Sequence, residues 1–427
     1  MLFLLKMAKL GFRLSLKGLN ETMPTVQREW YDNYMMPNYA PAAMIPVRGS
    51  GSRMWDQEGR EYIDFGGGIA VNVLGHAHPD LVAALTDQAE RLWHTSNVLA
   101  TEPSLKLARR LVELTFADRA FFSNSGAEAN EAALKLARRY AFDHYGKEKD
   151  RILAFDNAFH GRTLFTVTAG GQASYREGFG PLPGAIEHLP FNDIEALDGA
   201  FDEDVCAVIV EPVQGEGGVI AADKEFLETI RRLCDKHNSL MILDEVQTGV
   251  GRVGTLYAYQ AFDIVPDILT TAKGLGGGFP VAATLSSAEV ADSLKIGTHG
   301  STWGGNPMGC AVANAVLDIV SSDAVLEGVC ERRQQFEKAL RTLGDKYGLF
   351  GEIRGMGLLI GCLLNAPWQE KARGLMQAAQ DEGVFILVAG TNVLRMAPSL
   401  IIPQEDITEG IDRLERAIAR FCEAGKV

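Results

Sequence analysis

The chain has 427 residues, of which 47% are hydrophobic and 22% are charged. This composition is ordinary for a folded globular protein of two or three lobes, and it excludes fibrous and disordered chains. The formal net charge of −14 argues against a nucleic-acid partner, because phosphate binding needs clustered lysine and arginine. We therefore expect small-molecule partners.

The cysteines and histidines carry no recognisable metal or redox motif. No CxxC pair occurs, so neither a zinc ribbon nor a thioredoxin-like motif is indicated, and we interpret the six cysteines as reduced. His76 and His78 have no carboxylate at a metal-binding spacing, and His160 lies within an FHGR segment, so we predict no metal site. No run of about eighteen apolar residues is present, which predicts no membrane span and a cytoplasmic location.

Residues 1–22 differ from the rest of the chain. They carry four lysine or arginine residues against one acid, Glu21, and are amphipathic, as transit peptides are. They contain neither a long apolar region nor a cleavage site of small residues, so secretion is not indicated. Two interpretations stay open: an organellar leader, which would place the protein in an organellar matrix, or an upstream start codon with Met23 as the natural start.

From about residue 62 onward, apolar runs alternate with helical patterns. We expect strands at 120–125, 151–155, 206–212, 239–245 and 267–273, and helices at 127–145 and 224–237. Continuous apolar runs indicate strands buried on both faces, and their alternation with helices indicates a mostly parallel sheet. The pattern predicts a large α/β domain over residues 76–308.

After residue 308 the pattern changes to long amphipathic helices and then to short strands near 357–364 and 393–398. We expect a smaller α+β domain over residues 309–427, joined to the large domain by a helix that begins near Met308. Residues 23–75 are predicted to form an N-terminal arm and short strands that complete this smaller domain.

Three segments carry residues suited to chemistry. A strand ends at Ser125, Gly126 and Ala127 and runs into a helix, whose free first-turn amides and dipole favour a phosphate. The next feature is Asp244 at the carboxyl end of a strand, the edge where open α/β sheets bind ligands. Lys273 follows a buried strand, where burial would lower its pKa and favour the amine that condenses with an aldehyde. Taken singly, each has an ordinary explanation: tight packing, a helix cap, or a lysine beside a flexible loop.

Together these segments form part of a longer series. SGAEANE, FHGR, VEPVQGEGG, DEVQTGVGR, TTAKGLGGGFP and GSTWGGNP follow one another in the order found in class III aminotransferases, which the chain resembles over about residues 24–420. It is most similar to the bacterial members that act on acetylornithine and succinylornithine. The resemblance implies the type I fold of pyridoxal 5′-phosphate (PLP) enzymes, with a large α/β domain, a smaller α+β domain, and a homodimer with shared active sites.

Residue by residue, the resemblance implies that Lys273 forms the Schiff base with PLP and carries protons during the reaction. Asp244 would pair with the pyridine nitrogen, and Gln247 would reach the phenolic oxygen. Val246 and Phe159 would pack on the two faces of the ring.

The resemblance also implies a phosphate site shared between subunits. Ser125, Gly126 and Ala127 would hold the phosphate, although relatives often have threonine in place of Ala127, so that one hydroxyl contact is missing. Thr302 would reach the phosphate in the neighbouring subunit, with Ser301 beside it near the substrate.

For the substrates, the resemblance assigns two arginines, which bind carboxylates with two parallel hydrogen bonds. Arg162 would take the distal carboxylate, and Arg395 would take the α-carboxylate of glutamate or 2-oxoglutarate. Glu216 would pair with Arg395 while a donor without a carboxylate beside its reacting carbon is bound. Glu211 would be a supporting hydrogen-bond acceptor.

The implied reaction moves the δ-amine of N2-acetylornithine to 2-oxoglutarate and gives N-acetylglutamate semialdehyde and glutamate, as in arginine biosynthesis. The same chemistry on N2-succinylornithine in arginine breakdown, or on both donors, is the main alternative. A PLP aminomutase is more remote, because Arg395 and Glu216 are both retained. A non-catalytic PLP-binding protein is also more remote, because Lys273, Asp244 and both arginines are all present. A nicotinamide dehydrogenase is disfavoured, because no acidic residue ends a second strand about twenty residues after the glycine cluster.

Residues 66–68 are three consecutive glycines. We hypothesise that these small residues leave room for the acyl group on the α-nitrogen of the donor, where bulkier residues would restrict it.

Overall fold

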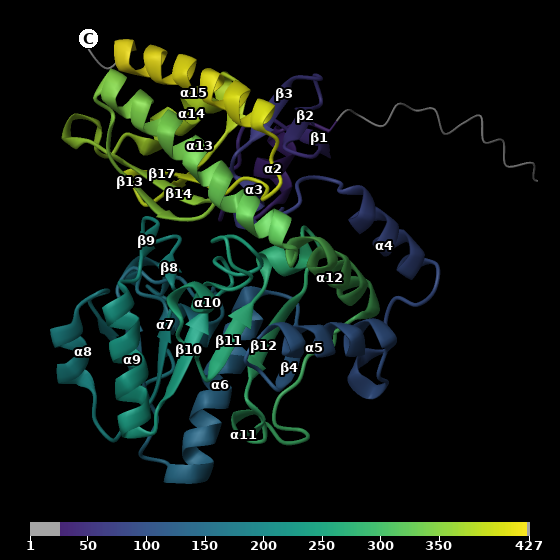
Figure 1. The fold of residues 1–427 in the computed structure, drawn as a ribbon, viewed down its shortest axis with the longest axis vertical. Helices are drawn as coiled ribbons and strands as arrows, with labels where there is room; N and C mark the ends of the chain where they lie inside the picture. The colour runs from purple at the N-terminus through teal and green to yellow at the C-terminus, as the bar shows by residue number, and fades with distance from the viewer. Residues whose placement is uncertain (1–25, 425–427) are drawn as a thin grey trace, which may run out of the picture.

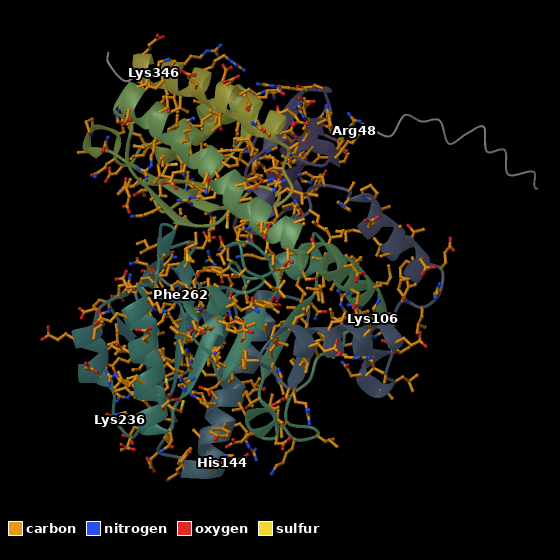
Figure 2. All side chains as sticks on the ribbon, viewed as in Figure 1. Arg48, Lys106, His144, Lys236, Phe262 and Lys346 are labelled. Atoms are coloured by element: carbon orange, nitrogen blue, oxygen red, sulfur yellow. The ribbon has the colours of Figure 1, made fainter. Side chains whose placement is uncertain are left out.

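The structure is a computed structural model that describes residues 26–424, so the basic segment 1–22 lies outside the described residues. Figure 1 shows two lobes, with the smaller lobe and the C-terminus at the top of the view. Charged side chains such as Lys236 and Lys346 lie at the periphery of the molecule, as Figure 2 shows, whereas Phe262 is buried. The α/β fold with a mostly parallel central sheet is confirmed.

A seven-stranded sheet forms the centre of the larger lobe. Its order is β4 (Arg119–Ser123), β12 (Ala282–Ser286), β11 (Ile268–Thr271), β10 (Leu240–Asp244), β7 (Val205–Val210), β5 (Arg151–Phe155) and β6 (Ile186–Leu189). The strands from β11 to β6 are parallel, and β12 is antiparallel to both of its neighbours. Because β4 and β11 are each antiparallel to β12, the carboxyl ends of β4, β11 and β10 meet at one edge of the sheet.

Helices cover both faces of this sheet. In β5, Ile152 packs in a core cluster with α6 (Gly126–Tyr145), whereas Leu153 packs in a second cluster with α9 (Lys224–His237). This alternation explains the continuous apolar runs, because successive residues face opposite cores. The remaining helices of this lobe are α4 (Pro79–Ala89), α5 (Glu102–Leu114), α7 (Leu164–Ala169), α8 (Ile194–Ala200), α10 (Ala258–Phe262) and α11 (Ala288–Ala291), with short 3₁₀ turns at Ser96–Val98, Ala173–Tyr175 and Lys273–Gly276.

The smaller lobe combines both ends of the described chain. One sheet has the order β13 (Phe350–Met356), β14 (Leu359–Leu364), β17 (Val393–Met396) and β16 (Leu387–Ala389). A second sheet pairs β1 (Pro46–Ser50), β2 (Arg53–Asp56) and β3 (Glu61–Asp64) with β15 (Val384–Phe385). The helices are α2 (Glu29–Tyr34), the short α3 (Gly67–Ala70), α13 (Asp323–Tyr347), α14 (Ala372–Asp381) and α15 (Gln404–Ala424), with a 3₁₀ turn at Ala366–Trp368. Residues before the large sheet therefore pair with residues that follow it.

Helix α12 (Pro307–Val320) packs on α4 and α5 of the larger lobe and leads into α13 of the smaller one. No single helix within residues 26–424 is long and apolar enough to cross a membrane; α12 and α13 reach that length only as a pair bent by 70°. A short two-stranded sheet, β8 (Val213–Gln214) with β9 (Ile220–Ala221), lies near β13.

Arg252 links the two lobes through hydrogen bonds. Its guanidinium is fully buried and donates to the carbonyl oxygens of Leu358 at 3.1 Å and Pro398 at 2.6 Å. The Leu358 amide donates in turn to the Arg252 carbonyl at 2.9 Å. Burial lowers the pKa of Arg252 to about 9. This arginine ties the loop after β10 to the end of β17.

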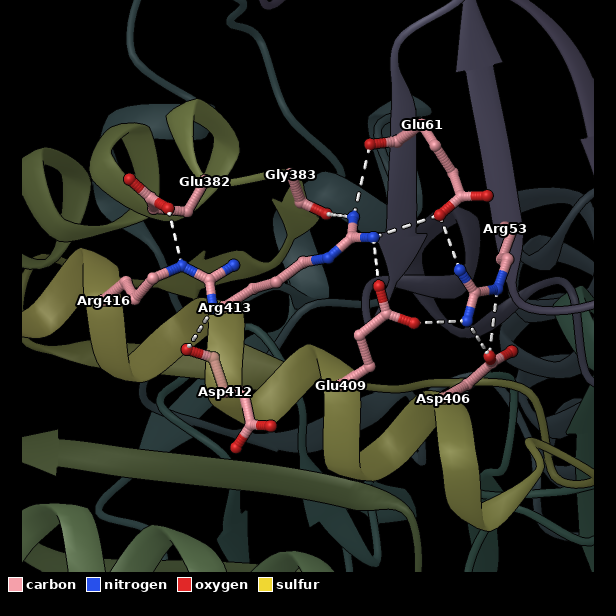
Figure 3. A network of polar contacts seen from close by, with 9 residues as sticks. All are labelled: Arg53, Glu61, Glu382, Gly383, Asp406, Glu409, Asp412, Arg413 and Arg416. Carbon is pink, nitrogen blue, oxygen red and sulfur yellow. Dashed lines mark hydrogen bonds and ion pairs between the residues drawn. The ribbon is translucent and has the colours of Figure 1, made fainter.

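A network of charges fastens the N-terminal strands to α15, as Figure 3 shows. Arg53 of β2 pairs with Glu61 of β3 at 2.5 Å, with Asp406 at 2.5 Å and with Glu409 at 2.6 Å. Arg413 contacts the same Glu61 and Glu409. Because each carboxylate is shared or multiply bonded, the network has a more fixed geometry than an isolated surface pair.

We predict that Arg53→Ala lowers the free energy of unfolding by about 1–2 kcal/mol. Arg416→Ala, which removes a more exposed arginine from α15, the helix that carries Asp406 and Glu409, should cost about 0.5 kcal/mol or less. Hydrogen bonds from Arg53 and Arg413 lower the pKa of Glu409, so this stabilisation exists above the unfolded-state pKa and is lost as the pH falls through the folded-state pKa. Urea unfolding at several pH values measures both effects, and equal costs for the two variants would contradict the prediction.

Candidate active site

A cavity of about 420 Å³ opens at the carboxyl edge of the large sheet. Most of the residues singled out in the sequence line it: Ser125, Gly126, Ala127, Phe159, Arg162, Asp244, Val246, Gln247 and Lys273. They come from the strand ends and helix starts that the parallel strands bring to one edge. Arg395 donates a hydrogen bond to Gln247, which lines the cavity, and forms an ion pair with Glu216. Both residues therefore lie beside the cavity.

The first turn of α6 forms one wall. Ser125 is the N-cap, and its own amide donates to Glu128 at 3.0 Å, so that amide is already satisfied. The amides of Gly126 and Ala127 belong to the first turn and have no acceptor within the helix, which makes them suitable for an anion. Gly126 has to be glycine, because a Cβ there would lie 2.7 Å from Val246 Cγ1.

Asp244 is held by a buried polar network at the end of β10. Its Oδ2 accepts a hydrogen bond from Asn130 Nδ2 at 2.7 Å and lies 2.7 Å from His160 Nδ1, and its Oδ1 accepts from the Val246 amide at 3.0 Å. Thr270 donates to Asn130 Oδ1 at 2.7 Å and so orients that amide. Asp244 also lines the cavity, and the side of the carboxylate that faces the cavity is open to a ligand.

His160 is fully buried, and its pKa reflects two opposed effects. Burial alone would lower the pKa, but the hydrogen bond and the charge of Asp244 outweigh it and raise the pKa. His160 Nε2 has no hydrogen-bond partner within the described residues. Asn130 and His160 were not predicted from the sequence as residues of this site. Their signal was weak, because a buried histidine or asparagine has an ordinary structural explanation.

Lys273 opens the 3₁₀ turn after β11 with φ of +39°, a left-handed conformation that non-glycine residues rarely adopt. Such backbone strain is typical of functional sites. Desolvation lowers the pKa of its ammonium, and nearby Arg395 lowers it further, while Glu216, Asp244 and Glu211 act in the opposite direction. The net lowered pKa increases the fraction of neutral amine, which is the nucleophilic form.

Arg395 of β17 forms an ion pair with Glu216 in the loop after β8. The arginine is only 2% exposed, and the same Nη1 donates to Gln247 Oε1 at 3.3 Å. The smaller lobe thus delivers a buried cation to a site that is otherwise built by the larger lobe. Gly215 permits the arrangement, because a Cβ there would lie 2.3 Å from Gln247 Nε2.

Two further buried glutamates differ in their roles. Glu211 lines the cavity and accepts from the Phe159 amide at 3.0 Å, and burial raises its pKa. Glu245 points away from the cavity and accepts from the amides of Ala258 and Tyr259 at the start of α10, while burial raises its pKa to about 7. Glu245 therefore has a structural role.

Arg162 is exposed at the mouth of the cavity, and no carboxylate in the described part of the chain pairs with it. Its guanidinium carbon lies 3.5 Å from the centre of the Tyr175 ring and 5.6 Å from that of Phe159. The charge is thus positioned but still available to an anion.

The glycines at 66–68 do not line this cavity, which in that region is lined by Val71 instead. Gly67 and Gly68 have φ of +55° and +62°, and a Cβ on Gly67 would lie 2.3 Å from the Ala397 carbonyl oxygen. Backbone conformation and close packing therefore account for Gly67, and the hypothesis that the glycines make room for an acyl group stays a prediction.

Comparisons with known proteins agree with this site. The family model for class-III aminotransferases matches residues 34–418. The chain belongs to the class-III aminotransferase family. It is 60% identical to an acetylornithine aminotransferase of Shewanella oneidensis, over 93% of this chain and 98% of the relative. It is 58% identical to a succinylornithine transaminase/acetylornithine aminotransferase of Pseudomonas aeruginosa, over 93% and 98%. The solved N-acetylornithine aminotransferase of Stenotrophomonas maltophilia superposes with a TM-score of 0.82 at 40% identity, covering 93% of this chain and 99% of that one.

In this class-III aminotransferase, Ser301 and Thr302 line a different cavity, of about 440 Å³. Asn124, which borders both cavities, donates to Ser301 Oγ at 3.3 Å. Within one copy of the chain, Ser301 and Thr302 therefore lie apart from the residues around Lys273.

We predict that Lys273 of the cofactor-free protein reacts with an amine-selective reagent at a lower pH than the exposed Lys147, because its pKa is lowered. Arg395→Met removes the nearby cation and frees the negative charge of Glu216, and both changes raise the pKa. The Lys273 profile should therefore move to higher pH, while that of Lys147 stays fixed. Peptide mass spectrometry after labelling across a pH series measures both, and coincident profiles for the two lysines would contradict the prediction.

Proposed function

We propose that this aminotransferase binds PLP and moves the δ-amine of N2-acetyl-L-ornithine to 2-oxoglutarate, giving N-acetyl-L-glutamate 5-semialdehyde and L-glutamate. The observation that carries the proposal is the buried ion pair of Arg395 with Glu216 beside Lys273. Glu216 can neutralise Arg395 while no substrate carboxylate is bound to it. Such a pair suits a site that first binds a donor without a carboxylate at the reacting carbon and then binds an acceptor that has one. The named activity of the relative at 60% identity supports the same substrate.

The described residues fit PLP. The cavity volume lies within the range of small-molecule sites, about 300–1,000 Å³. The free amides of Gly126 and Ala127 suit a phosphate, and the open side of the Asp244 carboxylate suits a protonated ring nitrogen. Val246 and Phe159 offer apolar surfaces for the two faces of the ring, and Gln247 offers an amide for its phenolic oxygen.

When bound, PLP supplies an aldehyde that bonds to amines and a ring that withdraws electrons from the adjacent carbon. Lys273 Nζ would hold this aldehyde, and the lowered pKa of the lysine favours the neutral amine that such a bond requires. As a free amine, the same Nζ would accept the proton from Cδ of the donor and return it as a general acid. Asp244 would stabilise a protonated ring nitrogen, and His160 and Asn130 keep that carboxylate in place.

The two arginines sort the substrates by their carboxylates. Arg162 binds the carboxylate of acetylornithine far from the reacting amine, because its charge is exposed and no carboxylate within residues 26–424 pairs with it. Arg395 stays paired with Glu216 in this half-reaction. When glutamate or 2-oxoglutarate enters, its α-carboxylate displaces Glu216 and takes the hydrogen bonds of the guanidinium.

The proposal includes a homodimer with shared active sites. Thr302 of one subunit would donate to the phosphate held by the other, and Ser301 would approach its substrate. Its support is the position of both residues outside the Lys273 cavity of their own chain.

Succinylornithine is the second candidate donor. It is favoured by the relative at 58% identity that is named for both activities. The two donors differ only in the acyl group, so both would use the same arginines.

We expect N2-acetylornithine to convert the PLP-loaded protein in a single half-reaction far faster than ornithine does, because the acyl group removes the positive charge of the α-amine. Stopped-flow loss of the visible absorbance of the lysine-bound cofactor measures the rates for acetylornithine, succinylornithine and ornithine. The ratio between the acylated donors decides between the two candidates, and Lys273→Ala should lack the starting absorbance. A faster reaction with ornithine would contradict the proposed substrate.

Glu216→Gln should affect the two half-reactions unequally. A neutral amide binds the Arg395 guanidinium more weakly than a carboxylate does, so glutamate should displace it more easily and bind about tenfold more tightly. The dissociation constant of acetylornithine should not change. Apparent dissociation constants from the same half-reactions test this. Glu113→Gln, which removes a charge from an exposed pair with Arg109, is the matched control. An equal shift for both substrates would show that Glu216 does not select between them.

A further inference from the structure

Tyr175 lies against Arg162 although nothing in the sequence motifs singles it out. It ends the short 3₁₀ turn Ala173–Tyr175, and the guanidinium carbon of Arg162 lies 3.5 Å from its ring centre. The Tyr175 and Phe159 rings meet edge to face, with centres 6.2 Å apart and planes at 88°. The two rings thus form a corner around the guanidinium.

The loop that carries Tyr175 is fastened to the rest of the site. The Gly171 amide donates to the Ala158 carbonyl at 2.9 Å, directly before Phe159, and a Cβ on Gly171 would lie 2.2 Å from the Phe155 carbonyl oxygen. Arg176, the residue after Tyr175, donates to the Thr168 carbonyl at 3.3 Å. Tyr175 is therefore placed by the same backbone that places Phe159.

An aromatic ring and a carboxylate use different parts of a guanidinium. The ring contacts its face, while the N–H groups that bind a carboxylate with two parallel hydrogen bonds lie along its edge. A protein carboxylate at Arg162 would occupy that edge, whereas Tyr175 leaves it open. Holding the flexible side chain in one place also reduces the conformational entropy that binding would otherwise cost.

We infer that Tyr175 is a positioning residue that holds Arg162 with its edge free for the distal carboxylate of the donor. The inference rests on the proposed function of Arg162 and deepens it. Tyr175 acts through Arg162, so it contributes to binding only for donors that carry this carboxylate.

The test compares N2-acetylornithine with N-acetylputrescine, which is the same donor without the carboxylate. In half-reactions of the PLP-loaded protein, Tyr175→Leu should raise the apparent dissociation constant of acetylornithine about fivefold and leave its maximal rate unchanged. The constant for N-acetylputrescine should not change. Tyr175→Phe keeps the ring and should restore the wild-type constant for acetylornithine.

Two further variants distinguish a wrong role for Tyr175 from a wrong role for Arg162. Arg162→Leu should remove the preference for acetylornithine over N-acetylputrescine altogether. Phe142→Leu, which removes an exposed ring next to Arg139 on α6, should leave both donors unchanged.

If Arg162→Leu removes the preference but Tyr175→Leu does not alter it, or shifts both donors equally, the inference is wrong and the proposed function stands. Equal losses in Tyr175→Phe and Tyr175→Leu also overturn it, because the ring would then not be the cause. If Arg162→Leu keeps the preference, the proposed role of Arg162 fails and the role of Tyr175 fails with it.

Discussion

The buried carboxylate of Asp244 is the constraint on which the site depends. A charge at the end of a strand that is buried on both faces is costly unless it is hydrogen-bonded and paired. The protein meets this requirement with His160, Asn130 and the Val246 amide, which come from three different segments. Those partners leave one side of Asp244 open, and the cavity with Lys273 lies on that side. The position of Asp244 therefore sets where a protonated nitrogen can be stabilised.

Both lobes contribute residues to the site at this edge of the sheet. The larger lobe supplies the strand ends and the helix start, whereas the smaller lobe supplies Arg395. Arg252 ties the two lobes together, because its guanidinium donates to the carbonyl oxygens of Leu358, in the turn before β14, and of Pro398, just after β17. Glu216 and Gln247 then meet Arg395 from the larger lobe, so the substrate-binding cation depends on how the lobes dock.

The sequence predicted those parts of the fold that follow from local chemistry. Continuous apolar runs predicted β5 at its exact bounds and placed Asp244 and Lys273 at strand ends. Strand β12 was missed, because AATLS is short, rich in small residues and has little apolar periodicity. It also runs antiparallel, which the alternation of strands and helices did not indicate.

The candidate site was predicted where motifs were contiguous and missed where contacts join distant segments. His160 and Asn130 meet Asp244 across more than 80 residues, so no local pattern links them. The packing reason for Gly67 was also missed, because it comes from the Ala397 carbonyl in the other half of the chain. Tyr175 was missed for the same reason, since its partner Arg162 lies in a separate motif.

The capping of α6 has a consequence for the proposed dimer. Glu128 takes the Ser125 amide, so the helix start retains few donors for a doubly charged phosphate. If Thr302 of a second subunit supplies a missing donor, cofactor binding and subunit association are thermodynamically coupled. Each then increases the equilibrium constant of the other by the same factor. Dilution of the protein would then weaken its hold on the cofactor, and loss of the cofactor would loosen the dimer.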